Sequence, residues 1–253
     1  VRIFSKVFDG MNTDNLVIRS LPFQPSFFNF IEDFVVLGHT PTSLIAFNNR
    51  VYAFGQREYS IINPDTMAIE HVSNSCGAAK RQHVAVCDHG IFVYYENNIY
   101  HIDMQKVSPI GDAISTLNRN IPSYTNGSYT IEPFGLDRCE QVLLAFMPAK
   151  QELIVAVTRG GIVGAFALGL KTNKWSYYQL HKYVSKPPIY FESGYARLLS
   201  VFEWQGYVYI AHRDKIGVAG FLTCLFAGSE NRKVVSIWEI DAGNKGQRKV
   251  AYK

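Results

Sequence analysis

Cysteines, charged residues and long apolar runs are scarce in this sequence of 253 residues, and each shortage excludes a class of protein. The cysteines are Cys76, Cys87, Cys139 and Cys224. They form no Cys-x-x-Cys pair, and no histidine stands at metal-ligand spacing from them, which argues against both a zinc site and a disulfide scaffold. We therefore expect reduced cysteines, no bound metal and assembly in a reducing cytoplasm.

Membrane and nucleic-acid binding are disfavoured on similar grounds. No segment reaches the roughly 18 consecutive apolar residues of a membrane helix, so we expect no membrane partner. The net charge is only +4, and the basic residues are scattered rather than gathered on one face. Sequence-specific nucleic-acid recognition needs such a face.

Aromatic residues, in contrast, are plentiful, with 15 Tyr and 17 Phe in the chain. Tyr, Phe, Val and Ile favour the pleated, half-buried surfaces of β-sheets. Charged residues make up 18% of the chain, below the usual quarter. This combination is typical of a large β core or of a chain that buries much of its surface against partners.

Short strands and tight turns recur along the chain. Residues 44–54 read as a strand, an Asn48-Asn49 turn and a second strand, and the same pattern returns at 84–95, 142–168 and 198–210. The spacing is close to the period of about 40–50 residues that is typical of propeller blades. The sequence therefore predicts an all-β fold of propeller-like repeats of small antiparallel sheets, with an additional β element at the C-terminus.

Three regions are expected from this pattern. Residues 1–40, rich in turn signals, are predicted to be an N-terminal arm, and residues 41–232 a β-propeller-like domain. The register changes near 233, so residues 233–253 are predicted to open a further β domain. The best helix candidate is short, residues 110–118. Residues 118–137 are expected to be irregular and longer than a connection between blades requires, and loops of that length are usually functional or disordered.

No catalytic or cofactor motif stands out. The sequence contains no Asp-box, no Gly-x-Ser-x-Gly elbow, no His-Glu-x-x-His zinc helix and no Gly-x-x-x-x-Gly-Lys phosphate loop. We therefore expect a protein that is not an enzyme and carries no cofactor. A propeller glycoside hydrolase remains an alternative, because paired carboxylates cannot be recognised by spacing alone. Trp175, which ends a strand–turn–strand unit, is expected to pack between sheets rather than to grip a sugar.

Several segments resemble the tail nozzle, hub or stabilisation proteins of short-tailed bacteriophages. The resemblance lies in a Ser-x-x-Cys-Gly-like motif, the strands after it, an earlier hairpin, a blade-ending Trp and a late strand pair. These are Asn74–Ala78, Val84–Val86, Gly90–Val93, Asn98–Asp103, Val107–Ile114, Leu44–Phe54, Lys174–Ser176 and Ile237–Arg248. The resemblance covers roughly residues 40–250. The chain departs from the pattern at Glu239, where a Thr is expected, and in the spacing of residues 124–139.

The resemblance implies a structural protein of the virion tail. Its partners would be identical copies forming a homo-oligomeric ring, together with other tail or portal-adaptor proteins, and DNA would pass through the channel without sequence-specific binding. The candidate interface residues lie in the long stretch 118–137, namely Pro122, Tyr124, Tyr129 and Pro133. The alternative function is a β-propeller binding module that recognises a cell-surface glycan or protein.

Overall fold

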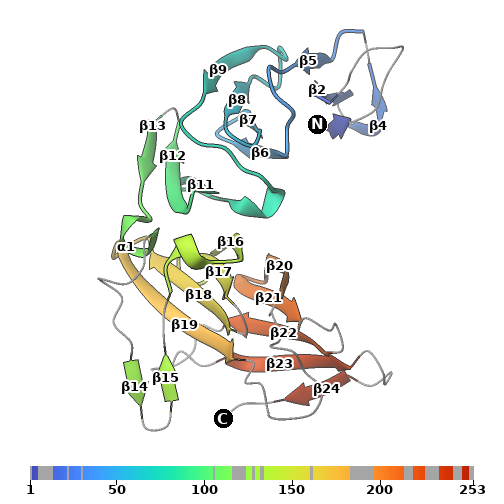
Figure 1. Cartoon of the computed structure of the whole chain (residues 1–253). Coiled ribbons are helices and arrows are strands. Elements are labelled where there is room, and N and C mark those ends of the chain that lie inside the picture. The colour runs from blue at the N-terminus through green and yellow to red at the C-terminus, as the bar shows by residue number, and fades with distance from the viewer. Residues whose placement is uncertain are drawn as a thin grey trace. The chain divides into compact units, whose positions relative to one another are not determined.

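The structure is a computed structural model. It describes residues 2–4, 14–21, 23–29, 31–104, 106–115, 124–126, 129–131, 134–159, 162–182, 197–213, 219–225, 234–241 and 247–250. The chain divides into two compact units, Val1–Pro109 and Ile110–Lys253, and each is considered by itself below (Figure 1). Within the described residues the chain is built from β-strands, with one short α-helix and two 3-10 turns. The predicted all-β fold is confirmed.

The first unit contains strands β1 to β13. In chain order these are β1 (Arg2–Phe4), β2 (Leu16–Ile18), β3 (Ser20–Leu21), β4 (Gln24–Phe28), β5 (Phe34–Val36), β6 (Ser43–Phe47), β7 (Arg50–Phe54), β8 (Tyr59–Ile62), β9 (Ile69–Ser73), β10 (Val84–Cys87), β11 (Gly90–Tyr95), β12 (Asn98–Asp103) and β13 (Lys106–Pro109), with the 3-10 turn η1 (Arg81–His83) before β10.

The second unit opens with a one-turn helix and continues in strands. In chain order its elements are α1 (Asp112–Ser115), β14 (Tyr124–Asn126), β15 (Tyr129–Ile131), η2 (Leu136–Arg138), β16 (Gln141–Met147), β17 (Glu152–Arg159), β18 (Ile162–Gly169), β19 (Lys174–Lys182), β20 (Arg197–Trp204), β21 (Tyr207–Arg213), β22 (Ala219–Leu225), β23 (Val234–Asp241) and β24 (Gln247–Val250).

Each blade-like sheet is an antiparallel meander in which every strand pairs with its neighbour in sequence. The sheets β6–β9, β10–β13 and β16–β19 have four strands, and β20–β24 has five. At the N-terminus, β1, β2 and β5 form a three-stranded sheet, and β3 pairs with β4. These are the small sheets of the propeller-like repeats that the sequence predicts, with the extra strands at the C-terminus.

Residues with positive φ angles close the tight hairpins. Asn48 and Asn49 between β6 and β7 have φ of 46° and 56°, as the predicted Asn-Asn turn requires. In the hairpin β11–β12, Asn98 pairs with Tyr95, so the turn residues are Glu96 and Asn97 and not the Asn97-Asn98 pair that residue type alone would suggest. Both have positive φ, and the non-glycine Glu96 takes a conformation that its sequence gives no reason to expect.

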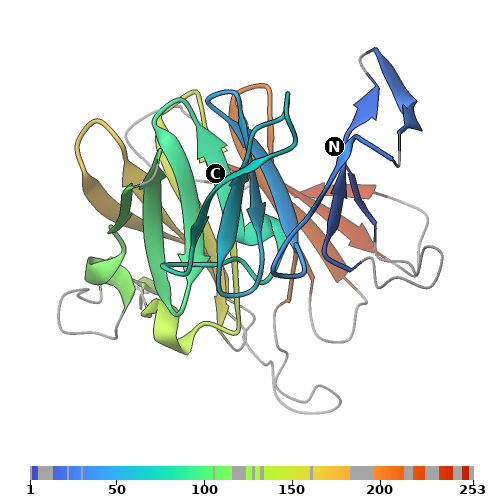
Figure 2. The same ribbon diagram turned by 90° about the horizontal axis from the view of Figure 1, so that it is seen from above.

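The sheet β6–β9 is covered on both faces by its neighbours within the first unit (Figure 2). One face, which carries Tyr52, Phe54 and Tyr59, packs against apolar residues that lead into and form β10–β13, such as Ile91 and Val93. The other face packs against residues of the N-terminal region. That second cluster consists of Val17, Leu37, Val51, Ala53, Ile62 and Met67. Because one small sheet cannot bury both its faces alone, the stacking itself supplies most of the core.

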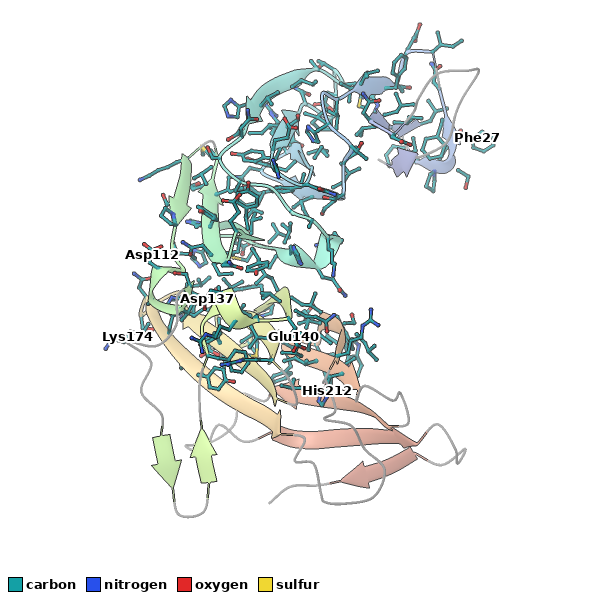
Figure 3. The ribbon with its side chains drawn as sticks, viewed as in Figure 1. Phe27, Asp112, Asp137, Glu140, Lys174 and His212 are labelled. Atoms are coloured by element: carbon teal, nitrogen blue, oxygen red, sulfur yellow. The ribbon has the colours of Figure 1, made fainter. Side chains whose placement is uncertain are left out.

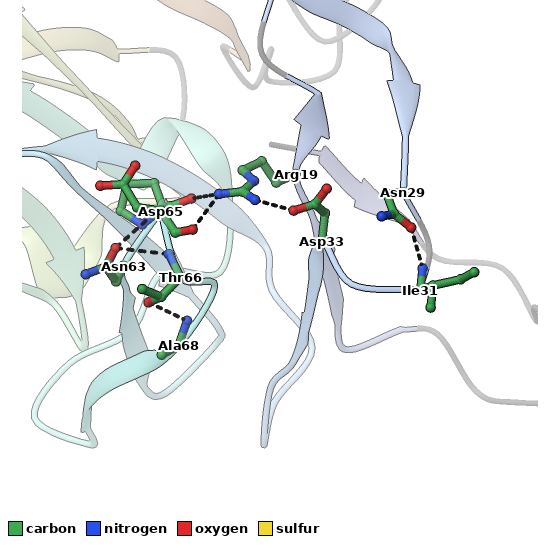
Figure 4. A network of polar contacts seen from close by, with 9 residues as sticks. Arg19, Asn29, Ile31, Asp33, Asn63, Asp65, Thr66 and Ala68 are labelled. Carbon is green, nitrogen blue, oxygen red and sulfur yellow. Dashed lines mark hydrogen bonds and ion pairs between the residues drawn. The ribbon is translucent and has the colours of Figure 1, made fainter.

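Arg19, just after β2, fastens this N-terminal sheet to the β8–β9 connection (Figure 4). Its guanidinium pairs with the Asp33 carboxylate and donates to the carbonyls of Pro64 and Asp65, both at 2.7 Å. Asn63 shapes the acceptor turn, since its Oδ1 accepts from the Asp65 N–H at 2.9 Å. Part of the region that the sequence predicts to be an arm, residues 14–37, is therefore folded as β2–β5 and in part fastened to the β6–β9 sheet.

Gly77 of the Cys76-Gly77-Ala78 motif allows the chain to cross close to the β7–β8 turn. A Cβ atom added at Gly77 would lie 2.5 Å from the backbone of Gln56 and Arg57, closer than any relaxed contact. The next residue, Ala78, donates its N–H to the Gly55 carbonyl at 2.7 Å. The glycine of this motif is thus required by close backbone packing.

Gly77→Ala is accordingly expected to lower the free energy of unfolding by about 1–3 kcal/mol, the usual cost of overpacking. The matched control is Gly38→Ala, because a Cβ at Gly38 meets nothing within 4 Å. Urea denaturation of both variants and the parent chain measures the difference. Equal stability of the two variants would contradict the close approach at Gly77.

In the second unit, the sheet β16–β19 is also covered on both faces. One face packs on β20 and β21 through residues such as Leu143, Ile154, Val201 and Ile210. The other face carries Phe166, Trp175 and Tyr177, and Phe134 lies edge-on to Tyr177 with ring centroids 6.2 Å apart.

Trp175 is half-buried, and its indole N–H donates to the Ile110 carbonyl at 3.2 Å. Its ring stands edge-on to that of Phe166, with the centroids 6.5 Å apart. Both contacts fit the packing role expected for this tryptophan, because an indole that is bonded and packed in this way is not a free platform for a sugar.

Three sequence-based boundaries differ in detail from the structure. The helix predicted over 110–118 is described only as α1, a single turn. The stretch 118–137, expected to be irregular, contains a hairpin in which Tyr124 pairs with Ile131 and Asn126 with Tyr129. The chain after 233 supplies β23 and β24 to the same sheet as β20–β22. The division into regions at 40 and 232 stays a prediction.

Candidate functional site: exposed apolar surfaces

The four residues predicted to form an interface fall at or near the β14–β15 hairpin. Pro122 and Pro133 lie outside the described residues. Tyr124 and Tyr129 are the first residues of β14 and β15, and each pairs with another residue rather than with each other. Their role in an interface stays a prediction.

A first exposed apolar surface lies on the N-terminal hairpin. The hairpin patch consists of Leu21, Phe23, Phe27 and Ile31, and the last three are 103%, 64% and 84% exposed. Figure 3 shows Phe27 projecting from the outer side of its strand into solvent. Large apolar side chains that gather on one exposed element are typical of a surface that binds a partner.

Charged residues flank the hairpin patch in sequence, with Arg19 before it and Glu32 and Asp33 after it. Residues 20–31 contain no charged side chain at all, whereas the next two are Glu32 and Asp33. Glu32 is exposed, and Asp33 is engaged by Arg19. An uncharged strand on an exposed edge lacks the usual protection against pairing with another chain.

A second exposed apolar surface lies on the side of β20 and β21 that faces away from β16–β19. Along these strands the buried residues Leu198, Val201, Val208 and Ile210 point into the core of the second unit. The alternate positions are Phe202 and Trp204 on β20 and Tyr207 and Tyr209 on β21, and the exposed Leu199 stands at the bulge between Leu198 and Ser200. These five residues are called the aromatic face. Leu199, Phe202 and Trp204 are 48%, 41% and 55% exposed.

The side chains of the aromatic face are ordered by mutual contact. Phe202 and Tyr209 are cross-strand partners whose rings stack at 5.5 Å with only 9° between their planes. Trp204 meets Tyr209 edge-on at 5.8 Å. Glu203, between them in sequence, pairs across the strands with Val208, and its carboxylate accepts from the Gly206 N–H at 2.6 Å. The result is a continuous aromatic surface on one side of the hairpin.

Sequence reasoning missed both surfaces, although signals were present. The hairpin patch is marked by a charge-free run with three phenylalanines between Leu21 and Phe28. The aromatic face is marked by alternation, because Phe202 and Trp204 flank Glu203 on one strand and Tyr207 and Tyr209 flank Val208 on the next.

No cluster of groups suited to metal binding occurs in the described part of the chain, where no three His, Cys, Asp or Glu side chains converge. Nor does any α-helix among the described residues have the length and apolarity needed to span a membrane. Cys76, Cys87 and Cys139 are free thiols, and the side chain of Cys224 lies outside the described residues.

Burial controls the chemistry of these thiols. Desolvation raises the pKa of Cys76 to about 12. Burial, followed by the nearby Asp137 carboxylate, does the same for Cys139. A thiol with such a pKa holds very little of the reactive thiolate at neutral pH.

We expect Cys76, which is fully buried, to react with a thiol reagent at pH 8 about a thousandfold more slowly in the folded chain than in guanidinium, where the pKa returns to about 8.5. Timed alkylation followed by peptide mass spectrometry measures the rate at this cysteine. Rapid labelling of Cys76 in the folded chain would contradict the burial described here.

No protein-family model matches the chain, and no curated protein matches it. Among solved structures, it is similar to an extracellular domain of a hybrid two-component system from B. thetaiotaomicron, at 9% identity and a TM-score of 0.48 over 88% of this chain and 30% of that one. An extracellular domain of a one-component system from the same organism is 11% identical, with a TM-score of 0.46 over 94% of this chain and 31% of that one. The dihydro-heme d1 dehydrogenase NirN is 11% identical, with a TM-score of 0.47 over 95% of this chain and 52% of that one. The chain thus spans less than a third of the first two and about half of the third, and these likenesses assign no role to any of its residues.

Proposed function

We propose that this chain is a structural subunit of the tail of a short-tailed bacteriophage. In this proposal, identical copies form a ring around the channel through which DNA leaves. The supporting observation is the hairpin patch, an uncharged element on which the side chains of Phe23, Phe27 and Ile31 are largely exposed. An exposed apolar patch of this kind favours association with another protein surface over a monomeric state.

The proposed mechanism is mechanical. The sheets β6–β9 and β16–β19 each bury both faces against neighbouring elements, and close-packed sheets of this kind are stiff. Stiff sheets would supply the walls, and loops and hairpins would contact identical copies and other tail or portal-adaptor proteins. DNA would pass without being read. The protein would be assembled in the host cytoplasm and reside in the virion tail.

Two features of the resemblance gain a physical reason that is compatible with this proposal. Gly77 is needed where the chain crosses the backbone at Gln56 and Arg57. Trp175 closes a blade-like sheet with a hydrogen bond to Ile110. Both roles are structural, as expected of a protein whose function is to be rigid.

The proposal is tested by electron microscopy of the purified 253-residue chain, which is expected to show rings with a central opening. Deletion of residues 122–133, which contains the β14–β15 hairpin, is expected to leave the β-type circular dichroism spectrum intact and to abolish the rings. Rings that form normally without this segment would contradict its part in assembly, and a chain that never forms rings would contradict the proposed function.

The second candidate function, a glycan-binding module, is favoured by one observation. Stacked and exposed aromatic rings are a common surface for sugars, and Phe202, Trp204 and Tyr209 form such a surface. If this function is correct, Trp204→Ala abolishes binding to a glycan array, whereas Trp175→Phe leaves binding unchanged. A monomer that binds a glycan would favour this reading over the ring.

A further inference from the structure

The aromatic face breaks a pattern that the other central sheets obey. Both faces of β6–β9 pack against other elements of the first unit, and side chains on both faces of β16–β19, such as Ile154 and Phe166, are buried. The sheet that begins with β20 is covered on its inner side by β16–β19, but its outer side exposes Leu199, Phe202 and Trp204. A sheet face this rich in aromatic side chains is suited to burial against a further β element.

The hairpin patch also leaves large apolar side chains exposed. It is a β-hairpin with exposed apolar side chains, and it follows the N-terminal sheet rather than covering another one. Within the described residues, the chain therefore exposes apolar side chains on a β-hairpin of the first unit and on a sheet face of the second unit. When two different surfaces of one chain fit each other, the contact is heterologous, and its repetition closes into a ring if the rotation allows.

Charges at the ends of the two surfaces are opposite in sign. At the end of β20 beside the aromatic face, Arg197 is exposed. The hairpin patch ends at Ile31 and the exposed Glu32. The acidic end of one surface thus matches the basic end of the other.

From these observations we infer that the aromatic face of one copy binds the hairpin patch of a second copy. Phe23 and Phe27 then lie on Phe202, Trp204 and Tyr209, and Glu32 lies near Arg197. This inference rests on the proposed ring, for which it names the subunit contact. It adds two surfaces that the resemblance does not point to, since the hairpin patch lies before residue 40 and the aromatic face lies between its matched segments.

The contact is tested by single variants and their mixture. Phe27→Ser and Trp204→Ser each remove one half of the contact, and each is expected to weaken self-association at least about tenfold, as loss of a central aromatic usually does. Mixing the two restores one good contact, because the intact hairpin of the Trp204 variant meets the intact face of the Phe27 variant. We expect a one-to-one dimer that does not grow further, measured by light scattering after size exclusion. The matched control is Met104→Ser, a side chain that is 65% exposed outside both surfaces, and it should assemble like the parent chain.

Charge reversal provides a second test. Glu32→Lys and Arg197→Glu should each weaken assembly, and the double variant should recover most of it. The inference is overturned if the parent chain forms rings but the single variants also form them normally, or if the mixture stays monomeric. The same holds if a glycan, and not a second copy, proves to occupy the aromatic face. The proposed function survives the first two results. A parent chain that remains monomeric overturns both.

Discussion

Phe54→Ala is expected to lower the free energy of unfolding by about 3–5 kcal/mol, the usual cost of truncating a buried phenylalanine. Phe54 is fully buried, and its ring lies 5.3 Å from that of Tyr59 on the face of β6–β9 that packs towards β10–β13. The truncation would leave a cavity at the junction between two stacked sheets, where neither sheet can relax without losing contacts with the other.

Denaturant titration followed by circular dichroism measures this loss. The control is Met104→Ala, which truncates a side chain that is 65% exposed outside both candidate surfaces and is expected to change stability by less than about 1 kcal/mol. If the two substitutions cost the same, the first unit does not derive its stability from stacked sheets.

Phe166→Ala is expected to have an effect of similar size in the second unit, about 3–5 kcal/mol. The Phe166 ring is 1% exposed and lies 4.9 Å from Tyr177 and 6.5 Å from Trp175. Its loss removes the surface against which both aromatic rings are held. Tryptophan fluorescence should therefore report the change, because Trp175 gains access to water.

The comparison with Phe54→Ala also tests whether the units are independent. If they unfold separately, Phe166→Ala shifts only one of two transitions, and Phe54→Ala shifts the other. Unchanged stability of the Phe166 variant would contradict the packing described for β16–β19.

Much of the fold could be predicted because local signals agree with it. Asn48-Asn49 provides the positive φ angles of a tight hairpin, and apolar strands of the right length flank it. The hairpin β14–β15 was missed although Asn126-Gly127 lies between Tyr-Thr pairs, since the length of the surrounding stretch suggested a loop. The turn at Glu96 could not be placed by residue type, because Glu has no preference for positive φ.

The candidate surfaces were harder to predict, because exposure is a property of the folded chain. Phe54 and Phe202 are both phenylalanines in strands of similar pattern, yet the side chain of Phe54 is buried and that of Phe202 is exposed. What decides between them is whether another sheet covers that face, and no local pattern records this. The bulge near Leu199 also shifts the register of β20, so that simple alternation along the strand does not assign the outer face.

The central claim is that copies of this chain bind one another to form a closed ring. The most direct measurement is the native mass of the purified 253-residue chain, by mass photometry or native mass spectrometry. A closed ring predicts a single species whose mass is an integral multiple of 28.6 kDa greater than one and does not grow with concentration. A species that stays at 28.6 kDa across the micromolar range would contradict it.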